Sequence, residues 1–329
     1  MVKPLAVALG DPAGIGPEIV AAAWAMRRQM NLPPFFAIGD RRSLAAVWDG
    51  PVQTLGGPAD AAAAFDEALP LVQVDDPGEI VPGDPNLAGA RCALDSLEIA
   101  VGLARTGTAA GLITGPVSKA QLYAIGFTYP GQTEFIAERC GVSTGNVVMM
   151  LAGPSLRTVP VTIHTALADV PRALTTELIM TRARVTARGL QRDFGIAQPR
   201  LSVAGLNPHA GEGGTLGREE LDIIAPAIEA LRLEGLDITG PHSADTMFHA
   251  EARARYDVAL CMYHDQALIP MKTLDFNDGV NVTLGLPIIR TSPDHGTAFN
   301  IAGKSIASPD AMIAAIRMAG ACAARRCAG

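Results

Sequence analysis

The chain alternates short apolar runs with longer stretches whose apolar residues recur at helical spacing. The short runs predict buried strands at 5–9, 35–38, 71–74, 111–114, 146–151, 158–163, 200–204, 258–262, 280–284 and 288–290. The longer stretches predict helices at 15–30, 41–48, 87–105, 175–194, 219–234 and 309–326, and another that begins at Ser118. This alternation from end to end is typical of an α/β fold with a largely parallel sheet. The strands at 146–151 and 158–163 are so close in sequence that we expect them to form one antiparallel pair.

Polar motifs follow five of the predicted strands. They are GDPAGIGPE at 10–18, GPVSK at 115–119, HTA at 164–166, GLNPHAGEGG at 205–214 and MYHDQ at 262–266. Ligands of parallel sheets bind at the carboxyl ends of the strands. Because several loops converge on that edge, the set predicts a functional site more strongly than any one motif does.

Composition and charge narrow the class of protein. Hydrophobic residues make up 49% of the chain and charged residues 18%, so the chain can bury sizeable cores. The net charge of −7 and the pI near 5.4 argue against a general nucleic-acid surface. The chain has neither an 18-residue apolar run for a membrane span nor an N-terminal apolar run long enough for a signal peptide. The five cysteines form no C-x-x-C motif, which favours a reducing compartment, and we expect a cytoplasmic protein.

The motif at 10–18 predicts a turn between a strand and a helix. Gly14 and Gly16 would let backbone N–H groups approach an anion at the positive end of the following helix. The motif is not a Walker A sequence, because no Lys-Ser/Thr pair follows it, and it lacks the G-x-G-x-x-G fingerprint of Rossmann folds. The residues leave a ligand-binding loop and a merely tight turn equally open.

Three histidines directly follow predicted strands in polar surroundings: His164, His209 and His264. Only the fold can bring residues so far apart in sequence together. Three imidazoles at neighbouring strand ends predict a divalent-metal site with an open coordination position. Asp265 and Glu212 lie near enough in sequence to orient two of the rings. The alternative is that each histidine makes only structural hydrogen bonds.

A long polar loop runs from Arg290 to Lys304. It is longer than a turn requires, which favours a binding role. Arg290, with Lys272 and Asn281 in the flanking segments, offers a forked cation, a point charge and an amide to a phosphate or carboxylate. The segment PGQTE at 130–134 offers further donors, or Thr133 simply caps a helix. These residues predict an α/β enzyme that binds a divalent metal and an anionic small molecule.

These motifs resemble one family over nearly the whole chain: the 4-hydroxythreonine-4-phosphate dehydrogenases of vitamin B6 synthesis, the PdxA family. The longest matching strings are MYHDQALIPMK at 262–272 and NVTLGLPIIRTSPDHGTAFNIAGK at 281–304. The resemblance implies a two-lobed α/β fold of the isocitrate/isopropylmalate dehydrogenase type, which binds NAD without a Rossmann fingerprint. A cofactor-side lobe would comprise about 1–125 and 285–329, and a metal- and dimer-side lobe about 126–284, with the active site in the cleft between them.

The family's functional residues carry over to matching positions. The metal ligands fall on His164, His209 and His264, in a site shared between the subunits of an obligate homodimer. The substrate contacts fall on Gln132, Thr133, Lys272, Asn281 and Arg290. The loop at 294–304 is similar to the adenine-side NAD loop of isopropylmalate dehydrogenases, which assigns the cofactor to Gly14, Asp294, His295, Gly296 and Asn300. We hypothesise that Lys272 or Asp245 assists removal of the substrate proton, and the sequence does not decide between them.

The resemblance implies oxidation of 4-phosphooxy-L-threonine by NAD or NADP. The product, 2-amino-3-oxo-4-phosphooxybutanoate, is a β-keto acid that loses CO₂ to give 3-amino-2-oxopropyl phosphate. A Zn, Mg, Co or Mn ion on neutral imidazoles would act as a Lewis acid on the substrate hydroxyl while hydride passes to the nicotinamide. The implied partners are a phosphorylated hydroxy-amino acid and a second subunit, with no nucleic acid and no membrane.

Two positions depart from the family pattern. The family commonly has His where Gln132 stands, and Gln donates a hydrogen bond but carries no charge. The family often has Asp where Asn300 stands, which would shift cofactor preference if that position touches ribose or adenine. The alternatives are a paralogous dehydrogenase of phospho-threonate or phospho-erythronate, a phosphate acyltransferase of related fold, and a non-enzymatic binding protein.

Overall fold

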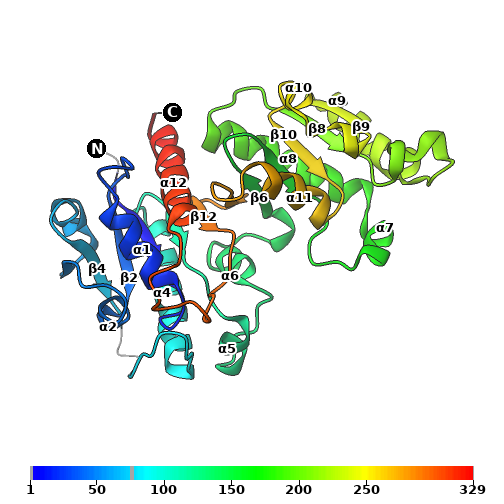
Figure 1. Ribbon diagram of the computed structural model, residues 1–329. Coiled ribbons are helices and arrows are strands. Elements are labelled where there is room, and N and C mark those ends of the chain that lie inside the picture. The colour runs from blue at the N-terminus through cyan, green and yellow to red at the C-terminus, as the bar shows by residue number, and fades with distance from the viewer. Residues whose placement is uncertain (1–2, 75–77, 329) are drawn as a thin grey trace. The chain divides into compact units, whose positions relative to one another are not determined.

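The chain folds into two α/β units. The computed structural model describes residues 3–74 and 78–328 (Figure 1). Unit 1 comprises Met1–Val142 and Leu286–Gly329, and unit 2 comprises Ser143–Gly285. No helix in the described ranges is long and apolar enough to span a membrane. The predicted α/β class is confirmed, whereas the assignment of cofactor and metal to separate lobes stays a prediction.

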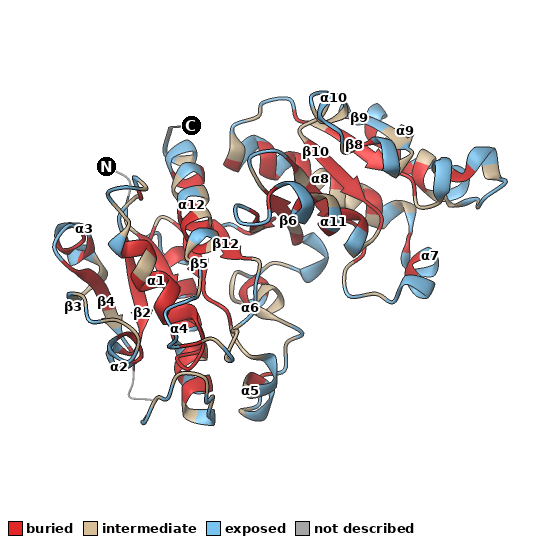
Figure 2. Ribbon diagram, in the orientation of Figure 1, coloured by how far each residue is buried: buried red, intermediate tan, exposed pale blue. Residues whose placement is uncertain are grey.

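Unit 1 is built on parallel strands in the order β3-β4-β2-β1-β5-β12. The strands are β1 Leu5–Ala8, β2 Phe35–Gly39, β3 Val52–Thr54, β4 Leu69–Gln73, β5 Leu112–Thr114 and β12 Arg290–Pro293. The helices are α1 Gly16–Ala25, α2 Arg41–Ala45, α3 Ala61–Ala64, α4 Leu87–Arg105, α5 Lys119–Ala124, α6 Gln132–Arg139 and α12 Asp310–Ala328. Helix α4 packs on β1, β2 and β5, and α12 packs on β12 and β5 and against α1. Every residue of β1 and β2 is buried (Figure 2), as expected of parallel strands covered by helices.

Unit 2 has the strand order β11-β6-β7-β10-β8-β9. The strands are β6 Val148–Ala152, β7 Arg157–Pro160, β8 Arg200–Ala204, β9 Asp237–His242, β10 Val258–Cys261 and β11 Val280–Leu284. The helices are α7 Val170–Ala173, α8 Thr176–Phe194, α9 Ala225–Leu233, α10 Ala250–Arg253 and α11 His264–Leu274. The predicted antiparallel pair is confirmed as β6 with β7, and β6 is also antiparallel to β11. Helix α11 buries Ala267, Leu268 and Met271 against Leu151 of β6 and Ala259 of β10.

Several local predictions were wrong. Residues 288–289 precede strand β12, which begins at Arg290, so the first four residues of the supposed loop form a buried strand. The strand can bury a polar side chain because α12 offers it a hydrogen-bond partner: the Thr291 hydroxyl donates to the Ala315 carbonyl at 2.9 Å. Thr133 does not cap a helix, because α6 begins at Gln132 with Gly131 as its N-cap. The predicted helix at 219–234 starts as a π-helical turn, Glu220–Ile224.

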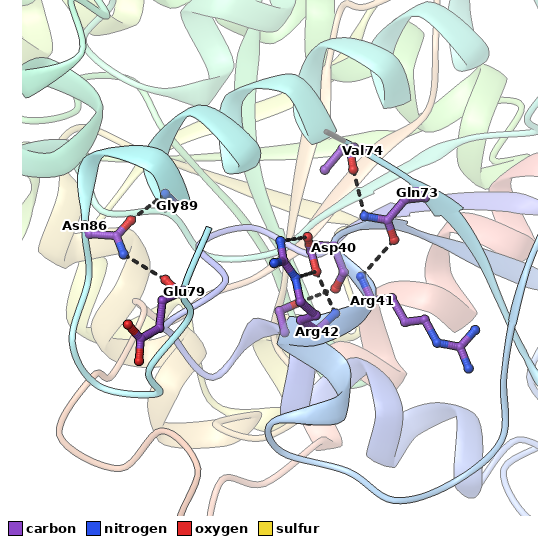
Figure 3. Close-up of polar contacts among 9 residues, drawn as sticks. Asp40, Arg41, Arg42, Gln73, Val74, Glu79, Asn86 and Gly89 are labelled. Carbon is purple, nitrogen blue, oxygen red and sulfur yellow. Dashed lines mark hydrogen bonds and ion pairs between the residues drawn. The ribbon is translucent and has the colours of Figure 1, made fainter. Parts of the chain in front are cut away.

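Polar side chains at the carboxyl ends of β2 and β4 organise the neighbouring helices (Figure 3). The Asp40 carboxylate is 1% exposed and caps α2, accepting hydrogen bonds from the Arg42 backbone N–H at 2.6 Å and its guanidinium at 2.9 Å. Gln73 accepts from the Arg41 backbone N–H at 2.9 Å, and Asn86 caps α4. In Rossmann folds an acidic residue after the second strand binds ribose. Here Asp40 starts a helix instead, in keeping with the absent fingerprint.

Replacing Asp40 with Ala should lower the free energy of unfolding of unit 1 by about 1 kcal/mol, because the N-cap of α2 is lost. The measurement is urea unfolding followed by tryptophan fluorescence, since Trp24 and Trp48 both lie in unit 1. The matched control is Asp40→Asn, which keeps an oxygen for the Arg42 N–H and should stay within about 0.5 kcal/mol of wild type. Equal stability of the Ala and Asn variants would contradict the capping role.

Candidate active site

The three candidate metal ligands follow three strands that lie side by side in unit 2. His164 follows β7, His264 follows β10 and His209 follows β8. Strand β10 pairs in parallel with β7 on one side and with β8 on the other. The carboxyl ends of the three strands therefore share one edge of the sheet, where ligands of α/β proteins bind.

Buried hydrogen bonds tie these strand ends to one another. The Thr162 hydroxyl, just beyond β7, donates to the Met262 carbonyl beyond β10 at 2.7 Å. The Gln266 side chain accepts from the Met262 N–H at 2.6 Å and donates to the Gly205 carbonyl beyond β8 at 2.8 Å. These hydrogen bonds fix the positions at which the three histidine-bearing loops begin. The sequence analysis did not single out Gln266. It could have been recognised as a polar residue on the apolar face of a helix.

The rings of His164 and His264 lie close together, with centroids 6.0 Å apart and planes inclined by 33°. The Nδ1 atom of His264 lies 2.7 Å from the Oδ1 atom of Asp265. An ionised carboxylate only accepts hydrogen bonds, so Nδ1 carries the proton and Nε2 of a neutral ring presents its lone pair. Asp265 therefore orients His264 as the sequence suggested, in the manner of a metal-binding imidazole.

His209 sits on an unusual backbone. Residues His209, Ala210, Gly211, Glu212 and Gly213 all have left-handed conformations, with φ values of 53°, 52°, 79°, 45° and 64°. Such a conformation costs about 1–2 kcal/mol for each residue other than glycine. Three residues in the run are not glycine, so the fold holds this loop against its local preference. Strain of this kind concentrates at functional sites.

One chain by itself does not gather a three-ligand metal site. Across residues 3–74 and 78–328, no group of three or more His, Cys, Asp or Glu side chains is placed to hold a metal ion. No hydrogen bond joins Glu212 to His209 among the described residues, so the suggestion that Glu212 orients this ring stays a prediction. Within one chain, the arrangement offers His164 and His264 as a pair.

The other candidate residues of unit 2 occupy separate elements. Lys272 is exposed on α11, and Asn281 is half-buried on β11. Asp245 is exposed in the short 3-10 turn Ala244–Thr246 and accepts a hydrogen bond from the Ser243 hydroxyl at 2.6 Å. That contact orients the Asp245 carboxylate.

In unit 1, predicted substrate residues meet at the carboxyl end of β5. The Arg290 guanidinium donates to the Thr114 hydroxyl at 2.8 Å, and the Gln132 amide nitrogen donates to the Gly115 carbonyl at 3.2 Å. The Gln132 Oε1 atom is buried and has no hydrogen-bond partner in the described chain. Thr133 is half-buried in the first turn of the same helix. Gln132 therefore presents an unused acceptor.

Arg290 is a buried cation. Burial lowers the pKa of Arg290 to about 10, while the negative charge of Glu134 opposes that shift. The guanidinium therefore stays charged at neutral pH. A buried charge is costly unless it is paired and hydrogen-bonded, so this position is suited to an anionic ligand.

The turn at 10–18 packs backbone to backbone against the loop at 294–304. The Ile15 N–H donates to the Thr297 carbonyl at 3.0 Å, and a side chain at Gly14 would bring its Cβ within 3.1 Å of that same oxygen. A Cβ at Gly16 would overlap the carbonyl oxygen of Leu9. Both glycines thus permit close packing within the protein, and the assignment of Gly14 to the cofactor stays a prediction.

Glu18, which the sequence analysis did not single out, fixes the far end of this loop. Its carboxylate is buried in the first turn of α1, and Oε2 accepts a hydrogen bond from the Gly303 N–H at 3.0 Å. Between the anchors at Thr297 and Gly303 lies Asn300, which is exposed, and His295 and Gly296 are exposed just before them. The loop is therefore held by its backbone and leaves its candidate cofactor residues accessible.

Two cavities in unit 2 lie away from the three histidines. One, of about 570 Å³, is lined by Arg184, Arg188, Glu234 and Asp237 among others and lies near the amino ends of β8 and β9. The other, of about 450 Å³, includes His242 and His249. Burial and the charge of Arg232 lower the pKa of His242. Neither lining includes a predicted site residue.

Comparison with known proteins finds relatives over nearly the whole chain. The family model described as "Pyridoxal phosphate biosynthetic protein PdxA" matches residues 31–319. A 4-hydroxythreonine-4-phosphate dehydrogenase from Zymomonas mobilis subsp. mobilis is 59% identical over 317 residues, covering 96% of this chain and 95% of that protein. The crystal structure of the 4-hydroxythreonine-4-phosphate dehydrogenase from Klebsiella pneumoniae has a TM-score of 0.88 at 36% identity and covers 98% of both chains.

Structural similarity extends to an enzyme whose named substrate differs. A terephthalate 1,2-cis-dihydrodiol dehydrogenase from Burkholderia xenovorans LB400 has a TM-score of 0.66 at 30% identity, covering 97% of this chain and 98% of that one. The same fold thus serves different alcohols, and substrate choice depends on side chains at the site.

Replacing Glu18 with Ala should release the 297–304 segment from α1. A hydrogen bond to a charged group contributes about 1.5–3 kcal/mol, so amide exchange in a peptide covering 297–304 should quicken about 10- to 100-fold. Hydrogen-exchange mass spectrometry measures this, with a peptide from α4 as internal reference. The control Glu18→Gln keeps an oxygen acceptor for Gly303 and should stay within about threefold of wild type. Unchanged exchange in Glu18→Ala would show that the contact does not hold the loop.

Proposed function

The chain belongs to the PdxA family of pyridoxal phosphate biosynthetic proteins, and on this basis we propose that it is an NAD(P)-dependent 4-hydroxythreonine-4-phosphate dehydrogenase. It would oxidise 4-phosphooxy-L-threonine to 2-amino-3-oxo-4-phosphooxybutanoate, which loses CO₂ to give 3-amino-2-oxopropyl phosphate. The relative at 59% identity carries that enzyme name. The geometry that supports this chemistry best is the pair of imidazoles, His164 and His264, 6.0 Å apart at adjacent strand ends.

His164 and His264 of one chain, with His209 of a second subunit, would hold one divalent cation, either Zn, Mg, Co or Mn. Neutral imidazoles are common ligands of such ions, and the rings of His164 and His264, with centroids 6.0 Å apart, lie close enough together to serve as two of them. When bound, the metal would act as a Lewis acid that lowers the pKa of the substrate's 3-hydroxyl. Lys272 or Asp245, both exposed on unit 2, would take that proton.

A homodimer would supply the third ligand. Large apolar side chains near the two paired histidines in sequence are exposed in the single chain: Leu167 is 67% exposed, Ile269 65% and Phe276 75%. A second subunit that covered these side chains would remove their apolar surface from water, which would stabilise the dimer. In a twofold dimer each subunit would supply the same residues to the other's site.

The loop at 294–304 and the turn at 10–18 would hold NAD or NADP through Gly14, Asp294, His295, Gly296 and Asn300. The backbone anchors at Thr297 and Gly303 support this assignment, because a fixed loop with exposed residues suits a dinucleotide. When bound, the nicotinamide would accept hydride from C3 of the substrate. Such a reaction belongs in the cytoplasm, where the thiols of Cys92, Cys140 and Cys261 would stay reduced.

The substrate's charged groups would bind to Gln132, Thr133, Lys272, Asn281 and Arg290. Arg290 is buried and charged at neutral pH, so the phosphate or carboxylate would offset the cost of burying it. The partnerless Oε1 atom of Gln132 suits a hydrogen-bond donor such as the substrate's amino group. A charged ammonium is a stronger donor than the hydroxyl that a sugar acid carries at the same position, so this acceptor would favour the hydroxy-amino acid.

A second candidate is a dehydrogenase of another four-carbon phosphorylated acid, phospho-threonate or phospho-erythronate. Its support is the neutral Gln132 and the 30%-identical structure named for a different alcohol. A phosphate acyltransferase is less well supported, because it would not need paired imidazoles at adjacent strand ends.

Replacing His209 with Ala should remove metal retention and turnover together, because one of three ligands is lost. We expect metal affinity to fall more than about 100-fold, beyond the loss that follows removal of a residue supporting a ligand. The measurements are metal content after gel filtration and NAD(P)H formation at 340 nm. The control is His249→Ala, at an exposed histidine outside the proposed site. Full activity of metal-stripped wild type would refute the metal's role.

Among phosphorylated four-carbon acids, 4-phosphooxy-L-threonine should be oxidised with a kcat/KM about 10-fold above phospho-threonate or phospho-erythronate. The reason is the acceptor on Gln132, which would bind the charged ammonium of the amino acid more strongly than the neutral hydroxyl that a sugar acid carries on the same carbon. A screen at 340 nm with NAD and NADP and with each of the four divalent metals measures the ratio. A preference for either sugar acid would overturn the assignment to pyridoxal phosphate synthesis.

A further inference from the structure

We infer that Glu220 is a positioning residue that presents His209 to the metal ion. This inference rests on the proposed function, because it takes His209 to be a ligand. It concerns a side chain that lies outside every group assigned above to the metal, substrate or cofactor. Glu220 is only 3% exposed and opens the π-helical turn Glu220–Ile224. A π-helical turn is rare and is often found at functional sites.

The Glu220 carboxylate grips the start of the strained loop. Its Oε1 atom accepts a hydrogen bond from the Asn207 backbone N–H at 2.7 Å, and Oε2 accepts from the Asn207 Nδ2 atom at 3.0 Å. Asn207 precedes His209 by two residues. One buried carboxylate thus fixes both the main chain and the side chain of Asn207, two residues before the left-handed run begins.

The same carboxylate also packs closely against the backbone of the loop. A side chain at Gly211 would bring its Cβ within 2.6 Å of Glu220 Oε2, and one at Gly205 within 3.1 Å of Oε1. Glu220 therefore lies between the end of β8 and the middle of the left-handed run. A backbone that its own residues disfavour needs such a contact to keep one conformation.

A carboxylate, rather than an amide, is required at this position. The Asn207 Nδ2 atom donates to Glu220 and also to Glu219 Oε2, at 2.7 Å. A glutamine at 220 that accepts from the Asn207 N–H would turn its own NH₂ toward that Nδ2 atom, so two donors would face each other. Flipping the Asn207 amide would instead set its oxygen against the Glu219 carboxylate. Neither arrangement satisfies all the groups.

The test measures Co²⁺ binding to the metal-free enzyme by its visible absorbance, together with the melting temperature without metal. Glu220→Gln should weaken Co²⁺ affinity about 10- to 100-fold and change the Co²⁺ spectrum, the effect expected when support for a metal ligand is lost. Gly211→Ala should act in the same direction, because its methyl group pushes the turn away from Glu220 and leaves every polar group in place. This second variant decides the matter if Glu220→Gln does not fold.

Glu219→Gln is the matched control. It makes the same chemical change one residue away, at a carboxylate that also accepts from the Asn207 Nδ2 atom. A glutamine at 219 can still accept that hydrogen bond with its amide oxygen, and the bond from the Asn207 backbone N–H to Glu220 is not affected. Its Co²⁺ affinity should stay within about threefold of wild type. A wild-type melting temperature in Glu220→Gln, combined with weakened Co²⁺ binding, separates positioning from a general loss of stability.

His209→Ala distinguishes failure of this inference from failure of the proposed function. If Glu220→Gln and Gly211→Ala bind Co²⁺ as wild type does while His209→Ala loses it, the positioning role is wrong and the metal site stands. If His209→Ala also keeps wild-type affinity, the proposed metal site is wrong, and the role of Glu220 falls with it.

Discussion

The parallel pairing of β10 with β7 and with β8 is the constraint on which the candidate metal site depends. It brings β7, β8 and β10 to one edge of the sheet, although Ala259 of β10 is 101 residues from its partner Thr158 and 57 residues from its partner Ser202. Thr162 and Gln266 then fix the strand ends by buried hydrogen bonds to backbone atoms of the neighbouring loops. The three histidines then lie on different local structures. His164 is in a loop, His264 is in the first turn of α11, and His209 is in the left-handed run. The sheet thus determines where the histidines lie, and local structure determines where their rings point.

Much of the fold follows from hydrophobic patterning. Helix α4 and strand β11 have the bounds that the sequence predicted, because strong periodicity coincides with clear end signals such as the Asn86 cap. The pattern missed β3 and β9, which lie at the ends of the strand orders and have only one buried residue between them, Ile238. It also misplaced β12, whose buried threonine and serine look polar in sequence. Their burial depends on α12, which is adjacent only in the folded chain.

The candidate site was predictable in kind but not in detail. Histidines after predicted strands were visible in the sequence, since chain order places them there. The roles of Gln266, Glu18 and Glu220 could not be predicted, because the sequence does not show whether a polar residue is buried or exposed. Only the tertiary contacts of the folded chain show it. The left-handed run at 209–213 was equally hidden, because only two of its five residues are glycine. The proposed contribution of a second subunit could not be predicted from the geometry of one chain.

In the proposed substrate site, Arg290 would link the folding of unit 1 to ligand binding. Its guanidinium gives up most of its hydration when the chain folds, and it is fixed against the Thr114 hydroxyl with the negative charge of Glu134 nearby. A phosphate or carboxylate that binds there would have to shed only its own water. Binding would add to the free energy of unfolding, so unit 1 would resist unfolding most strongly when the anion is bound.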